Sequence, residues 1–215
     1  MGGKLHIYAF GSICRGEYNI GSDIDLLAIV ESYNVQLDPS IFSIYSYSRI
    51  IEIWQEGNPF AWHLAIESQI IYSSDDINFI KSLEKPNEYR KCAEDCRKFF
   101  NLLSSAISSV RLEESSKTFE LSTIFLAVRN FATCFLLGTK KIGNFSKDSA
   151  LHMGEKSIKI SNSTYEILKR ARYLSTRGIG KMLEDKEIES ALTEIHLIEE
   201  WMKNLLCEVE KNVRI

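Results

Sequence analysis

The amino-acid sequence predicts an α+β protein, in which a small mixed β-sheet domain precedes an all-α helical bundle. Short apolar runs of strand length occupy the first half of the chain, whereas apolar residues in the second half recur with helical spacing. The composition is that of a globular protein, with 45% hydrophobic and 26% charged residues and 3 prolines among 215 residues. We therefore expect two domains, formed by residues 1–75 and 76–215.

The sheet domain is predicted from short apolar runs separated by turn-forming residues. Two short helices, 49–56 and 59–68, are expected on either side of a break at Gly57-Asn58-Pro59. The segments expected to be strands are 4–10, 24–30, 41–47 and 69–72.

The helical bundle is predicted from apolar stripes with three- and four-residue steps. Its first helix is expected to begin near Pro86, since proline suits the first turn of a helix, and its second to end at Gly138. The third opens with Ser163 and Glu166, spaced as a capping box, and closes at Gly178. A fourth helix carries the last apolar stripe of the chain.

Charge and composition limit the classes of function. A net charge of −3 argues against a protein that coats nucleic acid, although a local basic groove stays open. We find neither the ~20 uninterrupted apolar residues of a membrane span nor a signal-peptide core, so we expect no membrane partner and a cytoplasmic location. The 5 cysteines are scattered and odd in number, which favours reduced thiols over a disulfide framework.

A glycine turn follows the first predicted strand directly. Gly11 has no Cβ, so at this turn the backbone N–H groups of Gly11-Ser12 can come close to an anion. The turn therefore predicts a seat for phosphate.

Two aspartates open the next predicted strand. Asp23 and Asp25 are two residues apart, so both carboxylates project from the same face of a strand. Two close negative charges are costly unless a cation lies between them, and hard oxygen ligands suit Mg²⁺ or Mn²⁺. A divalent metal beside a phosphate seat implies group transfer at a nucleotide phosphorus. An isolated Asp-x-Asp is usually solvent-facing and an isolated Gly-Ser is merely a turn, so the combination carries the hypothesis.

The stretch from residue 10 to residue 26, FGSICRGEYNIGSDIDL, resembles the polymerase-β-like nucleotidyltransferase superfamily, of the minimal or antibiotic nucleotidyltransferase type with a C-terminal helical bundle. The signature of that superfamily is a Gly-Ser turn followed by an Asp-x-Asp strand. The resemblance implies that residues 1–75 are a nucleotidyltransferase catalytic domain, and that residues 76–215 are an acceptor-binding or dimerisation domain. The sequence leaves open whether the chain forms a homodimer.

The resemblance also implies roles for individual residues. Gly11 and Ser12 would bind the nucleotide phosphates, Asp23 and Asp25 would bind the metal ions, and Ser22 would orient the loop. The implied reaction moves a nucleoside monophosphate from an NTP, with ATP the first candidate, to an acceptor, and releases pyrophosphate. A small molecule, a protein or an RNA end could be that acceptor.

The sequence departs from the superfamily pattern at the third carboxylate. Members place this acid on the strand after the Asp-x-Asp strand, but residues 41–48 contain none. Glu52, just beyond the strand, is our candidate for a replacement catalytic residue. The departure also favours an alternative function, that of a catalytically degenerate nucleotide-binding or antitoxin-like regulatory protein.

Further charged residues could contact the acceptor or the phosphates. His63 and Glu67 are spaced i,i+4, so they could act as base and orienter or form a structural hydrogen bond. Arg170 and Arg177 share a helix face that could hold a triphosphate tail or an anionic acceptor, or could simply be solvated. Arg15 could steady the Gly-Ser turn or bind phosphate.

Overall fold

The computed structural model describes residues 3–17, 24–31, 36–112 and 116–213. Contacts divide the chain into two compact units, Met1–Arg90 and Lys91–Ile215. They group residues 76–90 with the sheet, and the domain division after residue 75 stays a prediction.

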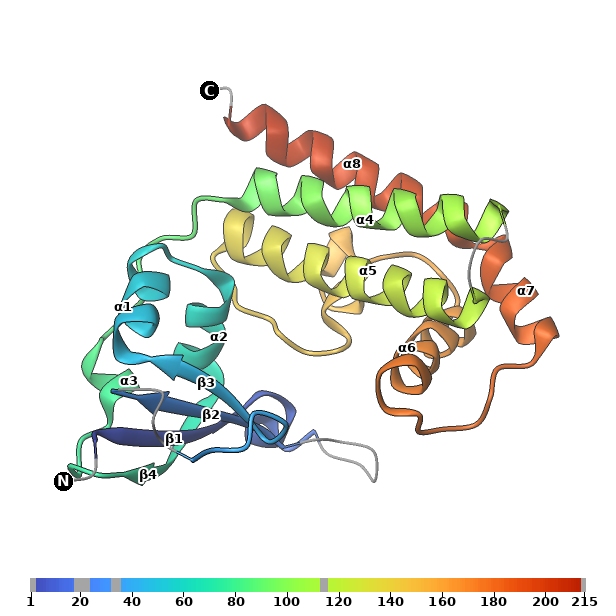
Figure 1. Cartoon of the computed structure of the whole chain (residues 1–215). Coiled ribbons are helices and arrows are strands. Elements are labelled where there is room, and N and C mark those ends of the chain that lie inside the picture. The colour runs from blue at the N-terminus through green and yellow to red at the C-terminus, as the bar shows by residue number, and fades with distance from the viewer. Residues whose placement is uncertain (1–2, 18–23, 32–35, 113–115, 214–215) are drawn as a thin grey trace. The chain divides into compact units, whose positions relative to one another are not determined.

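The first unit contains a four-stranded mixed sheet with strand order β3-β2-β1-β4 (Figure 1). The central strand β1 is antiparallel to both β2 and β4, whereas β2 and β3 are parallel. The strands are β1 (Leu5–Phe10), β2 (Asp25–Val30), β3 (Phe42–Ser46) and β4 (Ser68–Ser73). The four predicted strands are confirmed, and so is the α+β class.

Three helices belong to the first unit: α1 (Tyr47–Gln55), α2 (Pro59–Glu67) and α3 (Phe79–Ser82). The break between α1 and α2 lies where it was predicted, because the Asn58 side chain accepts a hydrogen bond from the Phe60 N–H and caps α2. The short helix α3 was not predicted. The core of this unit joins one face of the sheet to these helices through the buried residues Tyr8, Phe10, Leu27, Ile29, Ile50, Ile53, Trp54, Ala61, Leu64 and Ile80.

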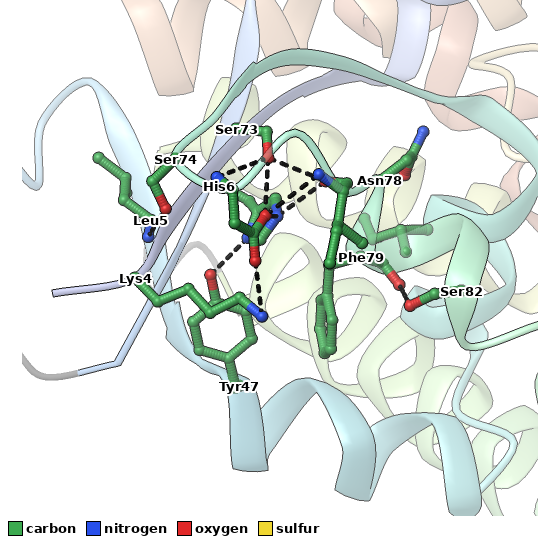
Figure 2. Close-up of polar contacts among 12 residues, drawn as sticks. Lys4, Leu5, His6, Tyr47, Ser73, Ser74, Asn78, Phe79 and Ser82 are labelled. Carbon is green, nitrogen blue, oxygen red and sulfur yellow. Dashed lines mark hydrogen bonds and ion pairs between the residues drawn. The ribbon is translucent and has the colours of Figure 1, made fainter.

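A polar cluster surrounds the buried His6 at the start of β1 (Figure 2). His6 is fully buried, and its Nε2 lies 2.8 Å from the carbonyl oxygen of Ile77 and 3.0 Å from Oδ1 of Asp75. Because a carbonyl only accepts, Nε2 donates in this contact, and Nδ1 forms a hydrogen bond with the Tyr47 hydroxyl. The Asp75 carboxylate also pairs with Nζ of Lys4 at 2.8 Å. This cluster ties β1 to α1 and to the segment after β4.

The stability of the first unit is expected to fall in acid through Asp75. The ion pair with Lys4, together with the hydrogen bond from Ser73, holds the pKa of Asp75 well below its ordinary value. A carboxyl group with a depressed folded-state pKa stabilises the fold at neutral pH, and this contribution is lost as the pH falls below about 5. The unfolding free energy, measured in urea at several pH values, should therefore fall less steeply with acid in Asp75→Asn than in the wild type. The exposed neighbour Asp76 provides the control, since Asp76→Asn should follow the wild-type curve. Parallel curves for Asp75→Asn and the wild type would contradict the prediction.

The second unit is helical, as predicted, and is built around the apolar helix α5 (Figure 1). This helix contacts α4, α6 and α8. It is long and apolar enough to cross a membrane, but 72% of its most apolar window is buried inside the protein, as in a core helix. The helices are α4 (Cys92–Leu112), α5 (Lys117–Lys140), α6 (Asn162–Arg177), α7 (Asp185–Thr193) and α8 (Ile195–Val213), with 3-10 turns at η2 (Ser149–Leu151) and η3 (Gly154–Lys156).

Two predicted helix ends in this unit are wrong. The first long helix begins at Cys92 and not near Pro86, and α5 continues past Gly138 to Lys140. Gly138 is the point where α5 lies against α4, because a Cβ at this position would stand 2.3 Å from Sγ of Cys92. The glycine therefore marks a close contact between two helices and not the end of one.

Only the C-terminal end of α6 agrees with the prediction. Gly178 ends the helix in the left-handed conformation, with φ of 64°. The N-cap is Ser161, whose side chain accepts from the Thr164 N–H, so the predicted capping box of Ser163 and Glu166 is wrong. The predicted fourth helix is two helices, α7 and α8, which meet at Glu194.

Candidate functional site

A 3-10 turn, η1 (Gly11–Arg15), follows the end of β1. Gly11 adopts a φ of 77°, and a Cβ at this position would lie 2.7 Å from Oδ2 of Asp25. Only glycine allows this backbone and this carboxylate to approach so closely. The structure thus brings together the glycine turn and one of the two aspartates singled out in the sequence. Ser12, the next residue of the turn, is buried.

Asp25 is placed beside the turn by the strand register. It is the first residue of β2 and pairs with Phe10, the last residue of β1. Its exposed carboxylate faces the space that a Gly11 side chain would fill, and hard carboxylate oxygens are what Mg²⁺ or Mn²⁺ prefers. Asp23 and Ser22 lie outside the described residues. Within the described part of the chain, no group of three or more His, Cys, Asp or Glu side chains could hold a metal ion.

The third carboxylate is absent from β3. In the parallel β2–β3 register, Leu27 lies beside Ser43 and Ile29 beside Tyr45. Asp25 shares a strand face with Leu27 and Ile29, so this face of β3 offers a serine and a tyrosine.

Glu52 does not lie on this strand. It is part of α1, which follows the end of β3 that is remote from Asp25. Its exposed carboxylate accepts a hydrogen bond from Nη1 of Arg49 at 3.0 Å. The structure does not bring Glu52 next to Asp25, and its catalytic role stays a prediction.

A partly buried charged cluster joins the turn to α2. Oε2 of Glu67, at the end of α2, accepts from Nη1 of Arg15 and lies 2.9 Å from Nε2 of His63. The His63 ring also packs edge-on against Phe10, with ring centroids 5.6 Å apart. The Nε of Arg15 donates to Glu17 at 2.9 Å. Arg15 and the His63–Glu67 pair, which the sequence analysis treated separately, are therefore one connected group.

Glu67 keeps its negative charge although its side chain is only 9% exposed. Burial raises the pKa of this carboxyl, but the hydrogen bond from His63 and the positive charge of Arg15 outweigh it, so the pKa lies below its ordinary value. Since an ionised carboxylate only accepts, Nε2 of His63 carries the hydrogen in this contact.

Arg170 and Arg177 belong to the second unit. Nη2 of Arg170 pairs with Glu187, and this contact lowers the pKa of Glu187 to about 2. The Arg177 guanidinium lies over the Tyr173 ring, 5.4 Å from its centroid. The two arginines share helix α6, but each is engaged with a different partner, and their predicted contact with phosphate or acceptor stays a prediction.

Comparison with known proteins finds a family match in the N-terminal part of the chain. A family model described as a nucleotidyltransferase domain matches residues 1–97. No curated protein matches the chain. Among solved structures, the chain is similar to the spectinomycin adenyltransferase AAD(9) from Enterococcus faecialis, crystallised with ATP and spectinomycin. The TM-score is 0.49 at 10% sequence identity, and the match covers 94% of this chain and 92% of that chain. Residues 1–97, which include the Gly11 turn and Asp25, are therefore similar to nucleotidyltransferase domains.

Proposed function

We propose that the chain is a metal-dependent nucleotidyltransferase, which transfers a nucleoside monophosphate from an NTP to an acceptor and releases pyrophosphate. The observation that carries the proposal is the approach of the Asp25 carboxylate to the Gly11 backbone, within the segment that matches the nucleotidyltransferase family. ATP is the first candidate for the NTP. The acceptor is a small molecule, a protein or an RNA, and the helical unit would bind it or form a dimer.

In the proposed reaction an acceptor oxygen attacks the α-phosphorus of the NTP. A bond forms between these two atoms, the bond from the α-phosphorus to the oxygen bridging to the β-phosphorus breaks, and pyrophosphate leaves with that electron pair. The proton of the acceptor hydroxyl passes to a base or to water. The backbone N–H groups of the turn at Gly11 would face the phosphates, and the carboxylates of Asp25 and Asp23 would hold Mg²⁺ or Mn²⁺. Such an ion supplies charge neutralisation on the phosphate oxygens and alignment of the attacking and leaving groups.

Removal of the carboxylate charge at Asp25 tests the proposal. The protein is incubated with α-labelled NTPs, Mg²⁺ and a panel of candidate acceptors, and transfer of label is measured. Asp25→Asn and Asp23→Asn should each reduce transfer by more than about 100-fold, because each leaves the metal one anionic ligand short. The control is Glu56→Gln, which changes an exposed carboxylate paired with Arg49 in the same unit and should transfer at the wild-type rate. Wild-type transfer rates in both aspartate variants would contradict the proposal.

The composition of β3 favours a second candidate function, nucleotide binding without turnover. Ser43 and Tyr45 occupy the face of β3 on which a third carboxylate would assist the metal or remove the acceptor proton. A regulatory protein of this kind would bind NTP in calorimetry but transfer no label to any acceptor. Label transfer by the wild-type protein would exclude it.

A further inference from the structure

The turn Gly11–Arg15, here called the nucleotide turn, is part of a closed ring of contacts. Glu67 is followed directly by Ser68, which pairs with Phe10 in the β1–β4 ladder. Gly11 follows Phe10 directly and opens the turn that ends at Arg15, and Arg15 returns to Glu67 through its guanidinium. The turn is therefore fixed at both ends, by the backbone ladder at Phe10 and by one buried ion pair at Arg15.

Charge compensation indicates what Arg15 does in this ring. Its Nε donates to Glu17 and its Nη1 to Glu67, so two carboxylates already face a single cation. Two carboxylates facing one guanidinium leave little of its positive charge to attract a triphosphate. The guanidinium is also largely covered, with 18% of its side chain exposed. Arg15 is thus better suited to holding the turn than to neutralising a phosphate.

The carboxylate of Glu67 is itself held in place by His63. The two residues are one helical turn apart on α2, with Nε2 of His63 2.9 Å from Oε2 of Glu67. The His63 side chain is 14% exposed, and its ring rests on the edge of Phe10, the residue that precedes the turn. Two donors from different elements therefore fix the direction of one buried carboxylate.

We propose that Glu67 is a positioning residue of the nucleotide site: through Arg15 it holds the Gly11–Arg15 turn against Asp25, and His63 keeps its carboxylate aimed at Arg15. This inference rests on the proposed function. It assigns to α2 the task of setting the shape of the phosphate seat, and it makes Arg15 a member of the same positioning group.

Whether Glu67→Gln weakens or tightens NTP binding distinguishes this positioning role from a purely electrostatic one. The substitution keeps the shape of the side chain but removes a negative charge near the proposed triphosphate site. If Glu67 acted only through its charge, binding of the NTP would become tighter, because a repulsive charge has gone. If Glu67 positions the turn, binding becomes weaker, and we expect a loss of at least about tenfold.

The experiment measures the dissociation constant of ATP with Mg²⁺ by calorimetry, together with the melting temperature and the KM and kcat of label transfer. Glu67→Gln and Arg15→Gln should both raise the dissociation constant and KM, and the double variant should bind within about twofold of the weaker single variant, since both changes break one contact. Glu56→Gln is the control and should bind as the wild type does. A purely structural role would lower the melting temperature and the active fraction but leave the dissociation constant of the folded protein unchanged.

The outcomes distinguish the two proposals. If the wild type binds ATP and Asp25→Asn does not, while Glu67→Gln or Arg15→Gln binds as tightly as the wild type, the positioning role is wrong and the proposed function stands. Losses that multiply in the double variant also contradict the positioning role, because the two residues would then act independently. If the wild type fails to bind any NTP with Mg²⁺, both proposals fall. Should Glu67→Gln not fold, the more exposed Arg15→Gln decides the question alone.

Discussion

Gly11→Ala is expected to reduce label transfer by more than about 100-fold while costing the fold only about 1–2 kcal/mol. The stability cost comes from the left-handed φ of 77°, which is unfavourable for a residue with a Cβ. The loss of transfer has a different origin. The new Cβ would lie 2.7 Å from Oδ2 of Asp25, so the carboxylate must turn away from the place where it would hold the metal. A displacement of about 1 Å at a reacting centre is enough for a loss of this size.

Gly16→Ala is the matched control for this prediction. Gly16 ends the same turn with a φ of 71°, but a Cβ there would meet no atom of the described residues within 4 Å. The two substitutions therefore carry the same backbone strain, and only the one at Gly11 meets Asp25. Urea unfolding should give similar losses of stability for both variants, while the transfer assay should separate them. Equal transfer rates in the two variants would show that the approach of Asp25 to Gly11 has no catalytic importance.

Gly138→Ala is expected to destabilise the helical unit by about 3 kcal/mol, which lowers its melting temperature by about 10 °C. The added Cβ would lie 2.3 Å from Sγ and 2.4 Å from Cβ of Cys92. Both helices are fixed by the core of the unit, so α4 and α5 must separate locally, and packing is lost along both. Circular dichroism during heating, followed at a helix wavelength, measures the effect.

Cys92→Gly should rescue this variant. It removes the atoms that the new methyl group meets, at the very start of α4, where the helix propensity penalty of glycine is smallest. The double variant should therefore melt at a higher temperature than Gly138→Ala alone. Additive losses in the double variant would mean that the instability arises elsewhere.

Much of the fold could be predicted from the sequence because its signals are local. The apolar runs of β1 and β2 lie between turn residues, and the Gly57-Asn58-Pro59 break both ends α1 and caps α2. Helix ends were predicted less well, because a glycine in a helical pattern can either end the helix or allow a close contact with another helix. Gly178 ends a helix through its backbone conformation, whereas Gly138 serves the contact with Cys92, which is distant in the sequence.

The candidate site was predicted in part for the same reason. The Gly11 turn and Asp25 are close in the sequence, and the antiparallel pairing of β1 with β2 brings them together. The Arg15–Glu67 pair joins residues 52 positions apart, and no local pattern in the sequence indicates it. His63 and Glu67 were paired by their helical spacing, but the same spacing does not reveal that their partner is the nucleotide turn. The buried His6 cluster gave no signal at all, since its members are scattered over β1, α1 and the segment after β4.

The burial of most of the apolar window of α5 also has a consequence for the synthesis of the protein. The helix packs against α4, which precedes it, but also against α6 and α8, which follow it in the chain. A ribosome therefore releases this long apolar helix before the helices that cover its other side have been made. Until α6 and α8 emerge, this segment exposes an apolar surface. It is therefore the segment to which chaperones or membrane-targeting factors would bind first.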